Sequence, residues 1–432
     1  MICGSASKVS VNSWRNSSSN LMSDAALGMD GLLTWTQARL VSHAAGKPLQ
    51  LATARLDESH GSLLGEALVT LADEPSVDVA QFDGYAVCAG GPWTLIDLSP
   101  EVALPQRYAT KLRAFEPVPP HTDAVLPFSQ GQLVEIQADE HQVIAYDSLN
   151  GTPDENARPD FGSGIIRQAA IAGAGRELVP ADSLVTPHVI SLAAAAGYDH
   201  LRICRPPVVS TLIIGESLLD QGPPRSDRAR DALGISIPAF VGALGARGNP
   251  HVRASETRDL LLEEIEDSHA DLLITTGSTA PGGENLLRTV LRDLAAHWLI
   301  DGVTMTPGAQ VLLARLPDGK LLLGLPGDPR SALAALMTIA PPLIAGLRGA
   351  AWVESTHTAV LMGETPLPDY AEDTTIVPVR VSTSPAGRTA QILDSDGPAG
   401  LSGVAGATDF AIVSPEMGSP GDVVLTISPF GA

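Results

Sequence analysis

Two stretches of the sequence combine glycines, hydroxyl side chains and the start of a helix, a pattern that suits anion binding. They are LITTGSTAPGGENLLRTVL (Leu273–Leu291) and LLLGLPGDPRSALAALM (Leu321–Met337). Each predicts a buried strand, a loop and then a helix, so backbone N–H groups and the positive end of the helix dipole would face one point. Two such units, about fifty residues apart, predict one α/β domain with one crevice for an anion such as a phosphate.

The two loops contain the residues that would form the cradle for this anion. Glycine lets the backbone approach a phosphate closely, and hydroxyl groups donate hydrogen bonds to it. The residues assigned to the cradle are Thr275, Thr276, Gly277, Ser278, Gly282, Gly283, Pro326, Gly327, Asp328 and Ser331. A strand-to-helix turn in an α/β protein is also commonly glycine-rich for structural reasons, so the pattern by itself fits both interpretations.

Three aspartates outside these loops lie at turn or helix-start signals, and a role for them in metal binding or proton exchange rests on a resemblance to a known family. They are Asp83 in FDGYAV, Asp160 in RPDFGSG and Asp231 in RDALGI. Each also has a structural interpretation, because Asp-Gly is a plain turn former and an aspartate before an apolar helix is a routine N-cap. The ten histidines form no HExxH spacing, so a catalytic zinc is not predicted.

The composition indicates a globular protein that binds neither nucleic acid nor anionic membranes. Hydrophobic residues make up 44% of the 432 residues, and 49 acidic against 27 basic residues give a net charge of −22. This charge repels nucleic acid and anionic lipid at long range. No run of 18 apolar residues is present to span a membrane. The longest candidate, Ala332–Leu347, is interrupted by Pro341 and Pro342 and predicts a core helix followed by its exit.

Cysteine usage and the first residues indicate a cytoplasmic protein. Cys3, Cys88 and Cys204 are odd in number and widely spaced, so neither a disulfide framework nor a metal cluster is predicted. Residues 1–22 are rich in Ser and Asn and lack an apolar core of signal-peptide length. They predict a disordered tail or a misassigned start codon.

The first half of the chain predicts helices around a β-rich segment. Residues 88–165 consist of short β-type pieces between Gly and Pro, which predicts a small β-rich domain. Helical spacing is found in Ser23–Ala45, Ser62–Leu71 and Pro187–Gly197, the last capped by Thr186. Between the first two helices and the β-rich pieces, Ser76–Val87 is strand-like and is interrupted by the Asp83-Gly84 turn signal.

The second half predicts alternating strands and helices after the linker signal Arg205–Pro207. The expected elements are strand Val208–Gly215, helix Ile235–Leu244, a strand near His251–Ala254, helix Thr257–Ser268 and strand Asp271–Thr275. This alternation predicts a parallel, doubly wound sheet. After Gly349 the pattern changes to short strands with Pro, Gly and Asp turns, which predicts a separate small all-β domain.

Four motifs, in order along the chain, resemble those of the molybdopterin molybdenumtransferase family, which includes the bacterial MoeA proteins and the E domain of gephyrin. FDGYAV (Phe82–Val87) resembles the family's MDGYA, and TTGSTAPGG (Thr275–Gly283) resembles TTGGVSVGD. MTPG (Met305–Gly308) resembles MKPGKP, and LPGDPRSAL (Leu325–Leu333) resembles LPGNPVSAL. No single motif decides the matter, but four in register identify the chain as similar to this family over residues 25–430.

The resemblance implies a multidomain α/β plus β fold. A helical linker domain would comprise residues 23–88 and 166–204, with a β-rich domain inserted at 89–165. A doubly wound α/β molybdopterin-binding domain would comprise 205–350, and a C-terminal β-barrel 351–432. Family members are elongated homodimers, with the active site between the α/β domain of one subunit and the linker and β-rich domains of the other.

The resemblance also implies a cytoplasmic enzyme of molybdenum cofactor biosynthesis. Its reaction inserts molybdate into adenylated molybdopterin, a pterin nucleotide, releases AMP and uses Mg²⁺. By position, Asp83, Asp160 and Asp231 would be catalytic, and Asp83, Asp231 and Glu216 would hold the metal. The partners implied are a second copy of the chain and other proteins of cofactor synthesis.

Several family positions are altered in this chain. Ser217 stands for a glutamate, Asn285 for an aspartate, Thr306 and Ala309 for two lysines, and Ala114-Phe115 for a Thr-Gly pair. The loop arginines could compensate: Arg225, Arg228, Arg230, Arg288 and Arg330. The alternative function is therefore a catalytically reduced paralogue that binds molybdopterin or a nucleotide as a scaffold or carrier.

Overall fold

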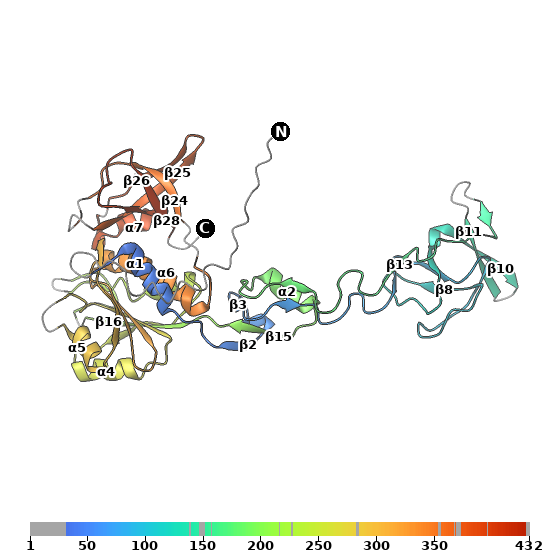
Figure 1. The fold of residues 1–432 in the computed structure, drawn as a ribbon, viewed down its shortest axis with the longest axis horizontal. Coiled ribbons are helices and arrows are strands. Elements are labelled where there is room, and N and C mark those ends of the chain that lie inside the picture. Colours follow the sequence, from blue (N-terminus) through green and yellow to red (C-terminus); the bar gives the residue numbers. More distant parts are fainter. Residues whose placement is uncertain are drawn as a thin grey trace, which may run out of the picture. The chain divides into compact units, whose positions relative to one another are not determined.

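The computed structural model describes residues 32–137, 140–146, 152–156, 158–215, 217–225, 228–281, 285–352, 356–366, 368, 373–394 and 396–428. The chain divides into two compact units. The first comprises Met1–Ala52, Gly61–Leu63 and Cys204–Ala432, and the second comprises Thr53–His60 and Leu64–Ile203. Figure 1 shows their elements, coloured along the sequence.

The first unit contains a mixed sheet with strand order β17-β16-β19-β23-β22-β20, and β18 also pairs with β16. Its strands are β16 (Val208–Ile214), β17 (Arg247–Gly248), β18 (Val252–Ala254), β19 (Leu272–Thr276), β20 (His297–Asp301), β22 (Leu312–Arg315) and β23 (Leu321–Leu325). The pairings of β16 with β17, β18 and β19, and of β19 with β23, are parallel, whereas β22 pairs antiparallel with both β23 and β20. The predicted parallel sheet is present, with an antiparallel extension.

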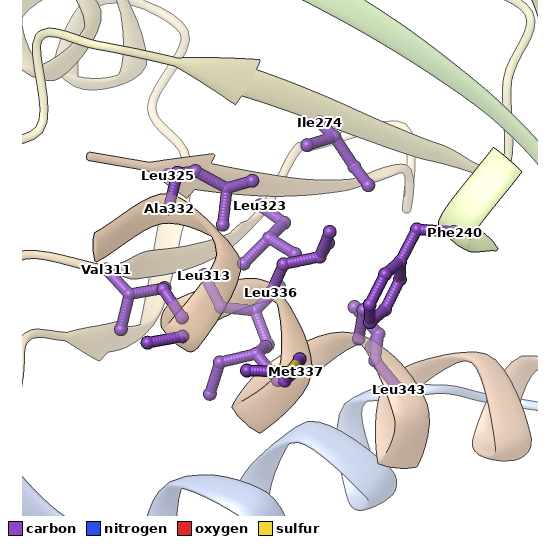
Figure 2. Packing of buried hydrophobic residues seen from close by; sticks show 14 of the residues in the cluster. Phe240, Ile274, Val311, Leu313, Leu323, Leu325, Ala332, Leu336, Met337 and Leu343 are labelled. Carbon is purple, nitrogen blue, oxygen red and sulfur yellow. The ribbon is translucent and has the colours of Figure 1, made fainter. Parts of the chain in front are cut away.

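Helices cover both faces of this sheet, as a doubly wound fold requires. They are α1 (Trp35–Ala45), α3 (Ile237–Ala243), α4 (Arg258–Glu266), α5 (Leu286–Asp293) and α6 (Pro329–Arg348). Successive strand residues face opposite sides, so Leu272 and Ile274 pack with α1, α3 and α6 while Leu273 packs with α4 and α5. Figure 2 shows part of the first cluster, to which Phe240 of α3 and Leu343 of α6 contribute.

Helix α6 continues through Pro341 and Pro342, so the predicted exit at these prolines is wrong. A proline inside a helix has no N–H to donate to the carbonyl four residues earlier, which leaves the carbonyls of Met337 and Thr338 without that bond. The buried Arg39 of α1 donates to both carbonyls from Nη1, at 3.4 and 3.3 Å. The arginine replaces the missing backbone donors and fixes α1 beside α6 (Figure 1).

Among the described residues, α6 is long and apolar enough to cross a membrane. Most of it is buried inside the unit, between the sheet and α1.

The rest of the first unit is a small β-barrel. Its strands are β24 (Thr356–Met362), β25 (Thr374–Ser384), β26 (Gly387–Ile392), β27 (Asp409–Val413) and β28 (Val423–Ile427). The order β25-β26-β24-β28-β27 closes because β27 also pairs with β25. Strands β1 (Leu33–Thr34) and β21 (Val303–Thr306) extend it alongside β25, and the short helix α7 (Ser402–Gly406) also lies in this region.

The second unit contains a sheet with strand order β10-β11-β7-β8-β6-β9. Its strands are β6 (Gly84–Val87), β7 (Trp93–Leu95), β8 (Tyr108–Leu112), β9 (Ala124–Pro127), β10 (Gly131–Gln137) and β11 (Glu140–Tyr146), with β12 (Pro153–Asp154) beside β11. Trp93 is fully buried in its core. The strand β8 was not predicted.

Smaller elements complete the second unit. Two-stranded sheets join β5 (Val79–Ala80) to β13 (Ile165–Ile166) and β4 (Leu68–Val69) to β14 (Glu177–Val179). A three-stranded sheet contains β2 (Leu51–Arg55), β15 (His200–Cys204) and β3 (Leu63–Leu64). Helix α2 (Pro187–Ala195) begins as predicted, because the Thr186 side chain accepts a hydrogen bond from the backbone of Val189.

Three predictions for the first ninety residues differ from the structure. The helix predicted at Ser62–Leu71 is wrong, because the backbone N–H groups of Leu64 and Gly65 bond to the distant carbonyls of Ser183 and Arg202 instead of to a local turn. Helix α1, expected in the linker domain, packs against α6 of the first unit. Strand β6, also placed in the linker, pairs with β8 and β9 in the β-rich sheet.

We predict that Arg39→Met lowers the free energy of unfolding by about 2–4 kcal/mol, because two buried carbonyls lose their donor. In a background carrying Pro341→Ala and Pro342→Ala, backbone N–H groups can bond to these carbonyls, so the same substitution should cost clearly less. Urea denaturation of the four proteins measures both values. An equal cost in the two backgrounds would contradict this account of Arg39.

Candidate functional site

The two glycine-bearing turns follow β19 and β23, which are adjacent and parallel, so both turns lie at the carboxyl edge of the sheet. Gly277 donates its backbone N–H to the carbonyl of Leu325 at 2.9 Å. A methyl group added at Gly327 would lie 3.5 Å from Cα of Gly277. The turns therefore touch each other, at the edge where open α/β sheets bind ligands.

The first turn offers fewer donors than the sequence predicted. Gly277 has φ +88° and Ser278 has φ +56°, so the chain reverses sharply after β19. Thr275 and Thr276 were predicted to donate to the anion, but their exposed fractions are 0% and 3%. Helices on both faces of the sheet enclose their side chains, which leaves Ser278 as the partly exposed hydroxyl of this turn. Gly282 and Gly283 lie outside the described residues.

The second turn combines a helix N-terminus with an acidic cap. Pro326 is buried, whereas Gly327 and Asp328 are exposed. The Asp328 side chain accepts a hydrogen bond from the backbone N–H of Ser331 at 2.9 Å, so it is the N-cap of α6. This carboxylate satisfies the helix end, and its charge opposes a second anion at the same place.

Asp231 lies in a small cluster of charged groups near the same edge. Its Oδ1 accepts hydrogen bonds from the backbone N–H groups of Leu233 and Gly234, both at 3.0 Å. Its Oδ2 is buried and has no hydrogen-bond partner among the described residues. The nearest basic side chains are Arg253, with Nη2 at 3.6 Å, and His251, with Nε2 at 3.8 Å. Asp231 is thus both an Asx-type cap and a carboxylate with one oxygen available to a cation.

Arg253 connects this cluster to the turns. It forms ion pairs with both Asp220 and Asp231, and its Nη1 lies 3.5 Å from the carbonyl of Gly215 at the end of β16. A methyl group at Gly277 would lie 3.3 Å from the carbonyl of Ile214 in the same strand. Asp220, Asp231 and His251 could together supply three ligand atoms to a cation. Glu216, predicted as a metal ligand, lies outside the described residues.

Asp83 and Asp160 belong to the other unit and are exposed there. Asp83 Oδ1 accepts a hydrogen bond from the backbone N–H of Ala114 at 2.8 Å. Gly84, the next residue, is required for a structural reason. A methyl group at this position would lie 2.3 Å from the carbonyl of Leu126 in the neighbouring strand. Tyr85 is buried in the sheet core, and this burial raises the pKa of its phenol.

Two of the positions at which the chain departs from the family pattern, Thr306 and Asn285, form internal hydrogen bonds. Thr306 Oγ1 donates to Asp373 Oδ2 at 2.6 Å, with both side chains buried. The Asn285 amide donates to the carbonyl of Ala280. Sequence reasoning missed Asp373 and Arg253, because no motif signals a partner 67 residues away or an arginine on a neighbouring strand.

The arginines proposed as compensation differ in availability. Arg288 pairs with Asp301 and also donates to the carbonyl of Thr279, so its charge is already balanced. Arg230 donates to the carbonyl of Leu219. Arg330, in the first turn of α6, has no ion-pair partner among the described residues, and it is the arginine nearest in sequence to the second turn.

A cavity of about 640 Å³ in the first unit lies away from these groups. It is lined at the amino ends of β19 and β23, for example by Asp271 and Leu321, and by Arg315 of β22. None of the residues predicted from sequence lines it. Cavity size alone therefore does not locate the site, whereas the turns and the charged groups favour the carboxyl edge.

Comparison with protein families decides the relationship. A model of the MoeA N-terminal region (domain I and II) matches residues 33–197, and a model of a probable molybdopterin binding domain matches residues 210–346. The chain belongs to the MoeA family. This confirms the predicted family and ties the chain to molybdenum cofactor biosynthesis.

Individual relatives of this MoeA-family chain agree. Molybdopterin molybdenumtransferases of Staphylococcus epidermidis and Staphylococcus aureus are each 24% identical to it, over 68% and 72% of the chain and 71% and 74% of their own lengths. A crystal structure of a molybdopterin biosynthesis MoeA protein from Pyrococcus horikoshii is similar with a TM-score of 0.72, at 20% identity over 93% of this chain and 100% of that one. A second from that organism gives 0.61, at 17% identity over 92% and 100%. These structures confirm the predicted fold class.

We predict that Asp328→Asn strengthens binding of inorganic phosphate. Asparagine caps a helix as well as aspartate does, so the turn should persist while one negative charge is removed. A unit charge at about 4 Å in water is worth about 1 kcal/mol, which corresponds to roughly fivefold in affinity. Isothermal titration should show this gain in Asp328→Asn but not in Asp318→Asn, an exposed aspartate in a turn away from both glycine-bearing turns. Unchanged affinity in both would place the anion elsewhere.

Proposed function

We propose that this MoeA-family chain inserts molybdate into adenylated molybdopterin, with release of AMP. The observation that supports this is the contact between the two turns at the carboxyl edge, where Gly277 bonds to the carbonyl of Leu325. A phosphorylated pterin needs such a site, because helix N-termini and turn N–H groups attract phosphate oxygens. Ser278, Gly327 and Ser331 would approach the phosphate from the two turns.

The chain's own residues would orient the ligand and balance its charge. Asp231 presents a buried oxygen without a hydrogen-bond partner among the described residues, and this donor fits Mg²⁺, which prefers carboxylate oxygens. Bound there, Mg²⁺ would neutralise phosphate charge. Arg253 already supplies one positive charge at 3.6 Å from that oxygen, so it would share the carboxylate. Arg330 would contribute a cation at the start of α6.

We infer that the active form is a cytoplasmic homodimer. In the family, the linker and β-rich domains of one subunit complete the site of the other. Asp83 and Asp160 would then reach the α/β unit of the second copy as its remaining carboxylates. Other proteins of molybdenum cofactor synthesis would be further partners, since the adenylated pterin must be delivered to the site.

A second candidate function is binding without efficient catalysis, as a scaffold or carrier for the pterin nucleotide. The specific observation in its favour is the bond between Thr306 and Asp373, which occupies a place where the family has a lysine. Losing a charge-assisted hydrogen bond to an oxyanion removes roughly 1.5–3 kcal/mol. Two lost lysines would therefore weaken molybdate capture by about 10²–10⁴.

The deciding experiment mixes the purified chain with adenylated molybdopterin, Mg²⁺ and molybdate and follows AMP by chromatography. The transferase function predicts AMP release that depends on molybdate. Tight binding of the pterin without AMP release would favour the carrier function instead. Absence of both binding and release would refute the two proposals together.

Mg²⁺ should raise the affinity of the chain for adenylated molybdopterin. We predict that Asp231→Asn reduces this gain in affinity about tenfold while leaving the fold intact. The Oδ1 acceptor for Leu233 and Gly234 is kept, but the charge that would attract the cation is lost. Asp293→Asn is the matched control, because Asp293 also pairs with an arginine, Arg258, but belongs to α5 and not to this cluster. Titration with and without Mg²⁺ measures the effect. An equal response of both variants would exclude a special role for Asp231.

If the carrier function holds, the triple variant Thr306→Lys, Ala309→Lys and Asn285→Asp should raise AMP release at least tenfold. Thr306→Lys and Ala309→Lys would restore the two cations of the family pattern, one of them beside Asp373, the present partner of Thr306. Thr306→Met, similar in length but uncharged, is the control and should give no gain. A wild-type chain that is already fast would show that the altered positions do not limit turnover.

A further inference from the structure

The most exposed large apolar side chains in the described part of the chain lie beside the two candidate carboxylates of the second unit. Phe161 is 77% exposed and follows Asp160 directly in sequence. Phe115 is 68% exposed and follows Ala114, whose N–H group bonds to Asp83. Single exposed apolar residues are common on protein surfaces. Two phenylalanines, each next to a candidate catalytic aspartate, are a more specific arrangement.

The backbone of Phe115 shows that packing does not explain its position. Glu116 donates its N–H to the carbonyl of Arg113, so Phe115 is the third residue of a tight turn. Its φ is +65°, a conformation that bulky residues rarely adopt and that favours glycine at this position. The chain keeps a strained phenylalanine whose ring gains little from burial. Strain of this kind is typically retained where a side chain has a function.

The two loops that carry these phenylalanines are attached to opposite edges of the segment that leads to Asp83. Phe115 donates its N–H to the carbonyl of Ala80 at 2.7 Å, on one edge of β5. On the other edge β5 pairs with β13, and Gln81 donates to the carbonyl of Gly164, in the loop that carries Phe161. The two loops are therefore anchored to one short strand, just before Asp83.

Phe161 also borders a small cavity of about 190 Å³, with Asp123 and Arg158 in its lining. This is below the ~300–1,000 Å³ of a site for a whole drug-sized ligand. It would accept a part of a ligand, such as a ring. The Arg167 guanidinium lies 5.8 Å from the centre of the Phe161 ring and helps to hold it.

We propose that Phe115 and Phe161 are stacking surfaces for the planar ring of a nitrogen heterocycle, with Asp83 and Asp160 accepting hydrogen bonds from its N–H groups. The proposal deepens the proposed function, on which it rests, by assigning ring recognition to the second unit. Aromatic side chains stack on heterocycles, and an exposed carboxylate selects rings that present donors at their edge. Both the pterin and the adenine of the proposed substrate have this chemistry, so the test uses both.

The test separates loss of a ring from relief of strain in the full-length chain. Phe115→Gly removes both the ring and the strain, and Phe161→Ala removes a ring alone. His121→Gly relieves the same φ of +65° in the same unit and keeps both rings. Binding of free pterin and of AMP to each protein is measured by isothermal titration, and stability by the urea midpoint.

Phe115→Gly and Phe161→Ala should each weaken binding of one of the two probes about 5- to 100-fold, the range found for stacking on one aromatic side chain. The probe affected identifies the ring. Phe115→Gly should also keep or raise the urea midpoint, because glycine adopts this φ without strain. His121→Gly should bind as the wild type does.

Several results would overturn the proposal: unchanged binding in both phenylalanine variants, a loss of binding that follows a fall in the urea midpoint, or no saturable binding of either probe to the wild type. Sedimentation is run on the same samples, and dissociation of the oligomer would mean that the rings pack on a second copy.

AMP release is measured separately. Normal AMP release by Phe115→Gly and Phe161→Ala would refute the stacking role and leave the transferase function standing. Weakened probe binding in these variants, together with no AMP release by the wild type, would support the stacking role and refute the transferase function.

Discussion

The placement of α6 depends on a buried arginine that replaces two missing backbone donors. Pro341 and Pro342 remove N–H groups from the middle of the helix, and Arg39 donates to the two carbonyls left behind. The guanidinium also lies over the Trp35 ring at 4.5 Å, so it is held by α1 itself. Because the first turn of α6 carries Asp328 and Ser331, this interaction in the core also positions the second turn of the candidate site.

The parts of the fold that follow from local pattern could be predicted from the sequence. The order of strand, glycine-bearing turn and helix is sufficient to place two turns at one sheet edge, since parallel strands bring their carboxyl ends together. Residues 62–71 show the limit of a prediction from local pattern. Their apolar spacing suits a helix, but the backbone pairs with segments more than a hundred residues away. A pattern within ten residues carries no information about such partners.

The candidate site could likewise be predicted only where a local motif marks it. The turns and Asp231 were found because their neighbours in sequence form motifs, yet the burial of Thr275 and Thr276 follows from helices packed on both faces of the sheet. The pairs Arg253–Asp231 and Thr306–Asp373 join residues on different elements. Whether a charge at a family position is lost or replaced is therefore decided by tertiary contacts that one sequence does not display.

The altered positions change the kind of force available for holding an anion. With a net charge of −22, the chain repels anions at long range, but this repulsion is screened beyond about 8 Å at physiological salt. Inside that distance the described cations are mostly engaged, because Arg288 pairs with Asp301 and Arg253 with two aspartates. Apart from Arg330 at the start of α6, what remains is the helix dipole and the N–H groups of the turns, whose strength depends on direction and distance. A site built from dipoles tolerates less displacement than one built from lysines, so the packing that fixes α6 is also a condition for binding.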